Sequence, residues 1–424
     1  MEHVAPKKCF VVSSATGCLT NLVETTTLRN SFNPSAYENV ATPDEADVIL
    51  VNTCGFNLAA EDASIGLISR LREQFPGKKV IVGGCLPGIN PAKLRKAHPG
   101  DTLKIGEWHK LNSILAPDAV DSGRLESDAN TVDAADLDTR RTINRLVQCL
   151  MPAYAGLSSL LKTDFQPLKN VMHSHSFDDK TYLIYVARGC LGTCSYCAIW
   201  HSKGRLSSKG LGRIRQEFEI GLEKGYKKFH LVADDVGCWG QDIGSDSAQL
   251  LRELLRVKGD YQIIIYYLDP TWLVKLYPSL REPLSDPRVI CVNIPIQSGS
   301  SSLVKKMNRK YSVEEVLARI GEIKSANPSL AAKTHLMAGY PEETADDFRL
   351  TLRSVPYFDV IVAHKFAPRP GTKAAEIEDQ VSPSVKAYRH LRLQAAVAAR
   401  HARVFVDSFL KSGPRQSRPG PLGS

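Results

Sequence analysis

Short apolar runs alternate with amphipathic helical patterns along the first 115 residues. The apolar runs lie at 8–13, 46–52 and 78–83, and helical patterns at 21–30 and 58–74 separate them. Continuous apolar strands that alternate with helices are typical of a parallel sheet covered on both faces. The pattern therefore predicts an α/β domain built on a parallel sheet.

A second and longer series of alternating elements begins at residue 181. Its six strand-like runs lie at 181–187, 228–233, 262–268, 289–294, 332–338 and 360–364. Helical patterns follow them at 207–224, 247–258, 271–277, 301–306, 313–324 and 344–355. Six successive strand–helix units predict a partial, open (β/α)6 TIM barrel, whose chemistry lies at the C-terminal strand ends.

The chain between and after these units has a different composition. Residues 116–176 begin with an acidic stretch that lacks a sustained apolar face, and residues 412–424 have the composition of a disordered tail. We therefore expect an N-terminal domain at 1–115, a linker or insertion at 116–176, and a barrel at 177–411.

The amino-acid composition is that of a globular protein. The chain has 424 residues, of which 43% are hydrophobic and 23% charged, as in globular proteins. Its longest apolar runs are only strand-length, so we expect no membrane helix. The N-terminus lacks a signal-peptide core, and ten cysteines without an export signal favour metal ligation in a reducing, cytoplasmic compartment. The net charge of +9 permits an anionic partner but is equally consistent with a dispersed basic surface.

Three cysteines follow the first barrel strand at C-x3-C-x2-C spacing: Cys190, Cys194 and Cys197. Thiolates in one short loop can hold an iron–sulfur cluster, and three of them leave one iron open to another ligand. A zinc site completed by His201 is one alternative. Ordinary buried thiols are the other.

Three more cysteines each follow one strand of the N-terminal domain: Cys18, Cys54 and Cys85. Open α/β sheets bind ligands beyond the carboxyl ends of their strands, so these side chains can meet although 36 and 31 residues separate them. Three independent loop or core cysteines are the alternative.

The loop at 190–197 resembles that of the radical S-adenosylmethionine (SAM) superfamily, C-x3-C-x-aromatic-C, with Tyr196 at the aromatic position. The resemblance implies a [4Fe–4S] cluster whose open iron binds SAM. Reduction by one electron, from a donor of the flavodoxin or ferredoxin type, would then yield a radical that abstracts hydrogen from an unreactive C–H bond.

The N-terminal motifs resemble those of the radical SAM methylthiotransferases. These motifs are G-C-x-x-N at 17–21, N-T-C-G-F at 52–56 and G-G-C-L at 83–86. The resemblance implies a flavodoxin-like domain in which Cys18, Cys54 and Cys85 hold a second [4Fe–4S] cluster. The N-T-C-G-F motif is closer to the branch that modifies a ribosomal protein. The family usually has Asp-Ser-Glu where this chain has Glu-Thr-Thr at 24–26.

Barrel motifs extend the resemblance and imply SAM contacts at Tyr196, Asp235, Gln297 and Lys333. Three positions depart from the family pattern: Asp234 replaces a glutamine, Lys333 an arginine and Glu342 a glycine. A lysine cannot form the two parallel bonds that a guanidinium makes with a carboxylate, so we expect the contact at Lys333 to differ in detail.

The family usually continues into a small all-β domain, TRAM, which contacts the macromolecular substrate. Here a basic helical pattern at 385–411 leads into the short tail. We therefore expect a monomer that acts on a peptide or small-molecule substrate in preference to a nucleic acid, and we expect no membrane partner.

The resulting hypothesis is a two-cluster enzyme that inserts a methylthio group into an unactivated C–H bond. Three alternatives stay open. The second cluster could serve only as an electron acceptor or substrate anchor in another radical bond formation. The substrate could be tRNA or ribosomal protein despite the missing TRAM domain. The chain could instead be a zinc-containing, RNA-binding module, whose binding would depend steeply on salt.

Overall fold

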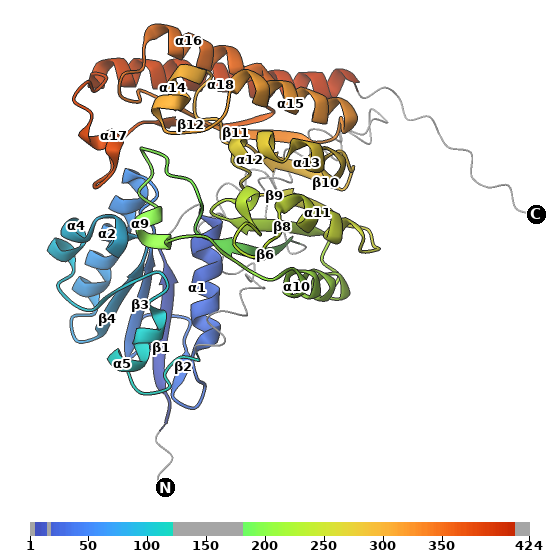
Figure 1. Cartoon of the computed structure of the whole chain (residues 1–424). Helices are drawn as coiled ribbons and strands as arrows, with labels where there is room; N and C mark the ends of the chain where they lie inside the picture. Colours follow the sequence, from blue (N-terminus) through green and yellow to red (C-terminus); the bar gives the residue numbers. More distant parts are fainter. Residues whose placement is uncertain (1–4, 15–17, 122–180, 412–424) are drawn as a thin grey trace, which may run out of the picture.

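The computed structural model describes residues 5–14, 18–121 and 181–411. Most of the predicted segment at 116–176 and the tail at 412–424 lie outside the described residues, as do Cys149, His173 and His175. Figure 1 shows two α/β units, with the N-terminal sheet beneath the larger C-terminal one.

The N-terminal unit is a five-stranded parallel sheet in the order β2-β1-β3-β4-β5, which confirms the flavodoxin-like prediction. Its strands are β1 (Lys7–Ser13), β2 (Tyr37–Asn39), β3 (Val48–Thr53), β4 (Lys79–Gly84) and β5 (Thr102–Lys104). Its helices are α1 (Leu19–Ser31), α2 (Leu58–Gln74), α3 (Leu86–Ile89), α4 (Pro91–Ala97) and α5 (Leu111–Ile114), with the 3-10 turn η1 (Trp108–Lys110) before α5.

Both faces of this sheet are covered, which explains its continuous apolar strands. Every residue of β3 is buried. Helix α1 packs on one face through Leu28, and α2 packs on the other through Ile68 and Leu71. Residues 116–121 continue this unit, because Val120 forms a bridge with Phe32 and is 2% exposed.

The C-terminal unit is a seven-stranded sheet in the order β12-β11-β10-β9-β8-β6-β7. Six strands are parallel and neighbour one another in chain order, which confirms the open (β/α)6 barrel. They are β6 (Thr181–Arg188), β8 (Lys228–Ala233), β9 (Gln262–Ile265), β10 (Val289–Asn293), β11 (Ala331–Ala338) and β12 (Val360–Lys365). The antiparallel edge strand β7 (Ser207–Ser208) occupies the start of the segment predicted as helical at 207–224.

Most helices of this unit cover the convex face of the barrel, and the helical segment after β9 is divided at Leu276 into α12 and α13. The helices of the unit are α9 (Trp200–Lys203), α10 (Leu211–Glu223), α11 (Ser247–Leu255), α12 (Pro270–Lys275), α13 (Tyr277–Leu284), α14 (Ser301–Lys306), α15 (Val313–Ala326), α16 (Ala345–Ser354), α17 (Lys373–Glu376) and α18 (Pro383–Lys411). The 3-10 turns η3 (Val236–Cys238) and η4 (Val355–Tyr357) complete the set. Within the described residues, no helix is long and apolar enough to cross a membrane.

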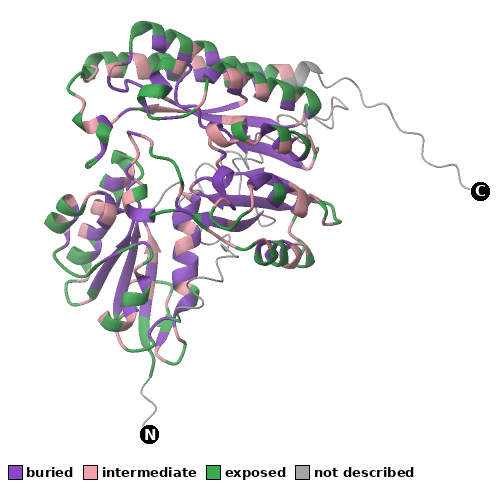
Figure 2. Ribbon diagram, viewed as in Figure 1, coloured by how far each residue is buried: buried purple, intermediate pink, exposed green. Residues whose placement is uncertain are grey.

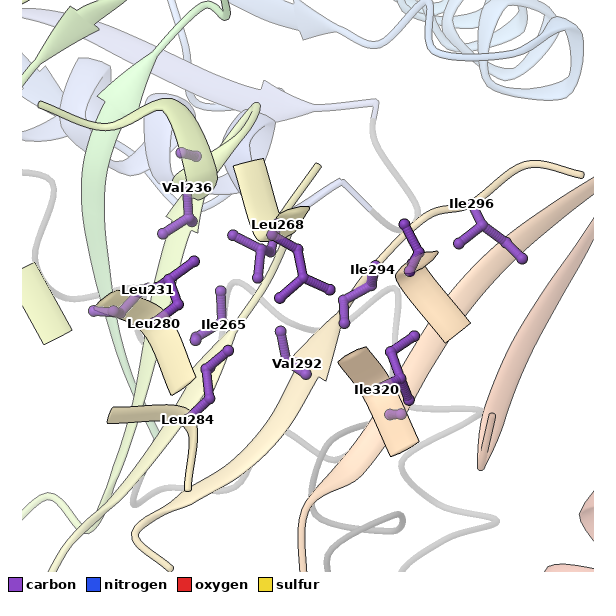
Figure 3. Close-up of a cluster of buried hydrophobic side chains, with 14 of the residues drawn as sticks. Leu231, Val236, Ile265, Leu268, Leu280, Leu284, Val292, Ile294, Ile296 and Ile320 are labelled. Carbon is purple, nitrogen blue, oxygen red and sulfur yellow. The ribbon is translucent and has the colours of Figure 1, made fainter. Parts of the chain in front are cut away.

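The two faces of the barrel sheet differ in chemistry. Alternate strand residues such as Leu231, Ile265 and Val292 face the helices and form a continuous aliphatic core with Leu280 and Ile320 (Figure 3). The residues between them face the concave side and include several polar side chains: His230, Asn293, Lys333, His335 and His364. A hydrophobic core is built from apolar side chains, so the polar side chains on the concave face indicate a binding surface and not a second core.

Helix α1 joins the two units. Its residues Leu19 and Val23 form a cluster with Leu183 of β6 and Val232 of β8, on the concave side of the barrel sheet. Figure 2 shows α1 largely buried, whereas the outer face of α18 is exposed. The N-terminal unit therefore docks against the open barrel, where the polar strand ends lie.

Candidate active site: two cysteine triads at the domain interface

The loop triad, Cys190, Cys194 and Cys197, follows β6 directly. Gly189 makes this turn possible because its φ is +71° and a Cβ there would lie 2.4 Å from the Arg205 carbonyl oxygen. The Gly189 N–H donates to Asp234 Oδ2 at 2.8 Å. The loop is thereby anchored to the end of the neighbouring strand β8.

Further bonds fix the middle of this loop. Ser195 Oγ lies 2.7 Å from the Tyr340 hydroxyl, and the Ser195 N–H donates to the Met307 carbonyl at 3.0 Å. A Cβ on Gly192 would lie 3.7 Å from the sulfur atoms of both Cys190 and Cys194. The glycine thus leaves the space beside two of the three thiols open.

The second set, here called the strand-end triad, consists of Cys18, Cys54 and Cys85. Cys18 is the N-cap of α1, Cys54 follows β3, and Cys85 is the N-cap of α3. The interaction of the Cys18 and Cys54 side chains lowers the pKa of Cys18 and raises that of Cys54, and Cys85 interacts electrostatically with both. The fold therefore brings the three cysteines together, as the strand ends predicted.

Burial governs the protonation of these thiols. It raises the pKa of Cys85 and of Cys197 to about 12, so each thiol must lose its proton on binding a metal. In the described residues, no group of three His, Cys, Asp or Glu side chains is placed to hold a single metal ion. The role of the six cysteines as cluster ligands stays a prediction.

His201 has contacts outside the loop triad. Its Nε2 lies 3.2 Å from the Gly371 carbonyl oxygen, and its ring stacks on Trp200 at 3.8 Å between centroids. These contacts give the Cys3His zinc alternative no support.

The barrel holds the loop of each strand-end cysteine. Next to Cys54, Arg369 donates to the Gly55 carbonyl at 3.0 Å and pairs with Glu61 at 2.5 Å, with side chains 7% and 1% exposed. Next to Cys18, Lys203 pairs with Glu24 of α1 at 2.5 Å.

Next to Cys85, helix α9 packs against α3. The contact is so close that a Cβ on Gly88 would lie 2.8 Å from the Ser202 Cα atom. Cys85 also shares an apolar cluster with Ala198, the residue after Cys197. One buried cluster therefore contains a strand-end cysteine and the residue that follows the last loop cysteine.

Of the four predicted SAM contacts, Tyr196 and Asp235 lie close to the loop triad. The Tyr196 hydroxyl accepts from Arg309 at 2.7 Å, and Arg309 also pairs with Asp269. Asp235 Oδ1 accepts from the Asp269 N–H at 3.0 Å. Burial, together with the Asp269 carboxylate, raises the pKa of Asp235 to about 7.

Gln297 follows β10, and Lys333 belongs to β11. Gln297 has φ +61° and bridges to Leu336 of β11, a strained conformation of the kind found at functional sites. Lys333 lies on the concave side of β11. The pKa of His335 is lowered mainly by burial, then by His364, and then by the charge of Lys333. Their roles as SAM contacts also stay predictions.

A histidine pair that the sequence interpretation missed connects this region to the strand-end triad. His335 Nδ1 lies 2.9 Å from His364 Nε2, and Asn293 Nδ2 lies 3.2 Å from His335 Nε2. The ring of His364 meets that of Phe56, two residues after Cys54, at 6.1 Å between centroids. Alternation along β11 and β12 could have placed both histidines on one face, but not their pairing.

The remaining described cysteines are core residues. Cys9 and Cys291 are 0% and 2% exposed within their strands. Cys238 is also buried, with its sulfur 3.2 Å from the Asp235 carbonyl oxygen.

Comparison with known families agrees with this architecture. Residues 10–106 match the Uncharacterized protein family UPF0004, and residues 184–355 match the Radical SAM superfamily. Among the solved structures, the radical S-adenosylmethionine methyltransferase TsrM from Kitasatospora setae has the same fold. It superposes with a TM-score of 0.58 at 13% identity, covering 87% of this chain and 77% of that one.

Curated relatives span both units. The ribosomal protein uS12 methylthiotransferase RimO of Citrifermentans bemidjiense is 29% identical, over 96% of this chain and 86% of the relative. The probable threonylcarbamoyladenosine tRNA methylthiotransferase of Pyrococcus abyssi is 26% identical, over 85% of this chain and 77% of the relative. The names of these relatives agree better with a macromolecular substrate than with a small molecule. The chain belongs to the radical SAM methylthiotransferase family, and it is an enzyme of that type.

Proposed function

We propose that the enzyme inserts a methylthio group into an unactivated C–H bond of a polypeptide, using two [4Fe–4S] clusters and SAM. Cys190, Cys194 and Cys197 hold one cluster, and the strand-end triad holds the other. When bound, these groups supply the hydrogen-abstracting radical and the methylated sulfur atom. A one-electron donor of the flavodoxin or ferredoxin type supplies the reducing electron.

The observation that carries the proposal is the adjacency of the two triads. Ala198, which follows Cys197, packs in the same buried cluster as Cys85. A carbon that loses hydrogen beside the loop triad is therefore near the sulfur carried by the strand-end triad. Proximity of this kind converts an encounter between two reactants into a step within one complex.

The chain's own residues hold and orient the reactants. Arg309 and Asp269 fix Tyr196 and Asp235 beside the loop triad, and the packed interface around α1 excludes water. The histidine pair, Asn293 and Lys333 provide polar contacts for the substrate on the concave face. His364 is neutral there at pH 7, because burial lowers its pKa to about 4.

Two observations favour a polypeptide over tRNA. The ribosomal-protein relatives align over 88–96% of this chain, and the tRNA relatives align over 85–91%. The predicted basic helix is also partly committed to internal bonds. Arg389 donates to Glu343, and Arg400 donates to the Phe358 carbonyl, at 2.7 Å each, so neither presents its charge freely to phosphate.

The test is a mass measurement on competing substrates. The reconstituted enzyme is incubated with reductant and with SAM that carries a deuterated methyl group. Recombinant ribosomal protein uS12 and bulk tRNA, both from Citrifermentans bemidjiense, are offered together. We expect the protein to gain one sulfur, one carbon and two hydrogen equivalents, with the deuterium label retained in the new methyl group.

Three results would each contradict a different part of the proposal: the substrate, the reaction or the source of sulfur. Labelled methylthio groups in tRNA alone would replace the polypeptide with a nucleic acid. A product that loses hydrogen without gaining sulfur would support another radical bond formation at the same site. A methyl gain without sulfur would remove the sulfur-donating role of the strand-end triad.

A further inference from the structure

Lys203 lies between the two triads. It ends α9, six residues after Cys197, and its side chain is only 2% exposed. Its ammonium group is 2.5 Å from Glu24 Oε1 of α1 and 3.8 Å from Asp234 Oδ1 at the end of β8. Glu24 lies six residues after Cys18 in the chain, on α1, and the Asp234 carboxylate accepts a hydrogen bond from the N–H of Gly189, the residue before Cys190.

The charge of Lys203 is well supported. Burial alone would favour the neutral amine, but Asp234 and Glu24 raise the pKa of Lys203 well above its usual value. Burial raises the pKa of Glu24 to about 7, which opposes the ion pair. We take Lys203 as an ammonium group, because two carboxyl groups face it and the contact with Glu24 is short.

Two buried polar atoms beside Lys203 make no hydrogen bond to any described residue. Glu24 Oε2 and the Tyr185 hydroxyl are buried, and neither has a hydrogen-bond partner in the described part of the chain. Lys203 also acts electrostatically on Cys18 and Cys85. The side chain thus combines a fixed position, a positive charge and proximity to the strand-end triad.

We propose that Lys203 is a positioning residue that compensates the charge of the cluster held by the strand-end triad and thereby sets its reduction potential. Three thiolates and their cluster carry net negative charge, and one-electron reduction by dithionite adds one more. A buried ammonium stabilises the reduced form more than the oxidised form, so it raises the potential. The inference rests on the second cluster of the proposed function.

The test isolates that cluster in the full-length chain. A Cys190→Ala/Cys194→Ala/Cys197→Ala background is reconstituted anaerobically, and its potential is followed by electron paramagnetic resonance during titration with dithionite. We expect Lys203→Met to shift the potential to a more negative value. Glu24→Gln removes a negative charge from the same network and should shift the potential the opposite way.

Two controls separate charge from structure. Lys203→Arg retains the charge, so its potential should stay near that of the background protein. Lys209→Met breaks a comparable buried pair, because Lys209 lies 2.9 Å from Glu217 with side chains 14% and 1% exposed. A purely structural effect would move the potential in Lys209→Met as well.

The outcomes distinguish the inference from the proposed function. A cluster that assembles with the same potential in Lys203→Met and Glu24→Gln as in the background would overturn the inference alone. Shifts of the same sign in both variants would also overturn it. A background protein that binds no iron would overturn the inference together with the two-cluster mechanism.

Discussion

The two cysteine triads are positioned in contrasting ways. The loop triad spans eight residues of one turn, and its position depends on local features such as the left-handed Gly189. The strand-end triad spans 68 residues and exists only because three parallel strands end at one edge. Each of its loops is also held by the barrel, through Lys203, Arg369 or α9.

This difference means that the strand-end triad depends on domain docking, whereas the loop triad depends on its own turn and the adjacent strand ends. A substitution that weakens the interface between the two units should therefore disturb the strand-end triad more than the loop triad. The following predictions run from the largest expected effect to the smallest.

Replacement Arg369→Leu should give the largest effect. It removes the bonds to the Gly55 carbonyl and to Glu61 Oε2, while Glu61 keeps its contacts with Lys93 and Asn90, so we expect the free energy of unfolding to fall by roughly 3 kcal/mol. Urea denaturation of the apo-protein measures the loss, and iron analysis should show depletion at the strand-end triad first. The control Arg349→Leu breaks only an exposed pair with Asp346, so it should change stability by less than about 0.5 kcal/mol. Equal effects from the two variants would disprove the docking account.

Replacement Arg309→Lys tests the loop triad. A lysine keeps the charge but lacks the fork of two nitrogens with which Arg309 reaches Tyr196 through Nη1 and Asp269 through Nη2, so we expect the binding free energy of SAM to weaken by about 2 kcal/mol. SAM affinity, measured by equilibrium dialysis on the reconstituted enzyme, should fall while the iron at the strand-end triad remains. Unchanged affinity would show that Arg309 does not organise this site.

The histidine pair predicts an acid-sensitive interface. Burial lowers the pKa of His364 to about 4, so between pH 4 and 6.5 the unfolded chain binds more protons than the folded one. Stability is therefore lost as the pH falls through this window, by at most about 1.4 kcal/mol per pH unit for one histidine. Denaturation of His364→Gln across this range should give a flatter profile than the wild type. Glu24 and Asp235, whose pKa values are raised, have the opposite slope, so the prediction concerns the difference between the two proteins.

The smallest expected effect is a gain. Glu342 has φ +60°, at the position where the resembling family has glycine, and such a conformation costs a non-glycine residue about 1 kcal/mol. Glu342→Gly should raise stability by about that amount, as measured by thermal denaturation. Glu342→Ala keeps the strain and loses only the half-exposed pair with Lys306, so it should show no gain. A gain in both variants would instead implicate the carboxylate.

These contrasts also explain what the sequence could predict. Long apolar strands such as β3 and the compact cysteine loop carry local patterns, so both were predictable. The three-residue edge strands β2 and β5 are too short to show a period. Arg309, Lys203 and Arg369 were missed because their partners lie 40, 179 and 308 residues away along the chain. Their importance follows from burial, which one sequence alone does not reveal.

The most direct test of the account counts iron and labile sulfide after anaerobic reconstitution. The samples are the wild type, the loop-triad triple alanine variant and the strand-end triple alanine variant. We predict about eight irons per chain in the wild type and about four in each variant. About four irons in both the wild type and the strand-end variant would contradict the two-cluster mechanism, and zinc in place of iron would contradict radical chemistry in this chain.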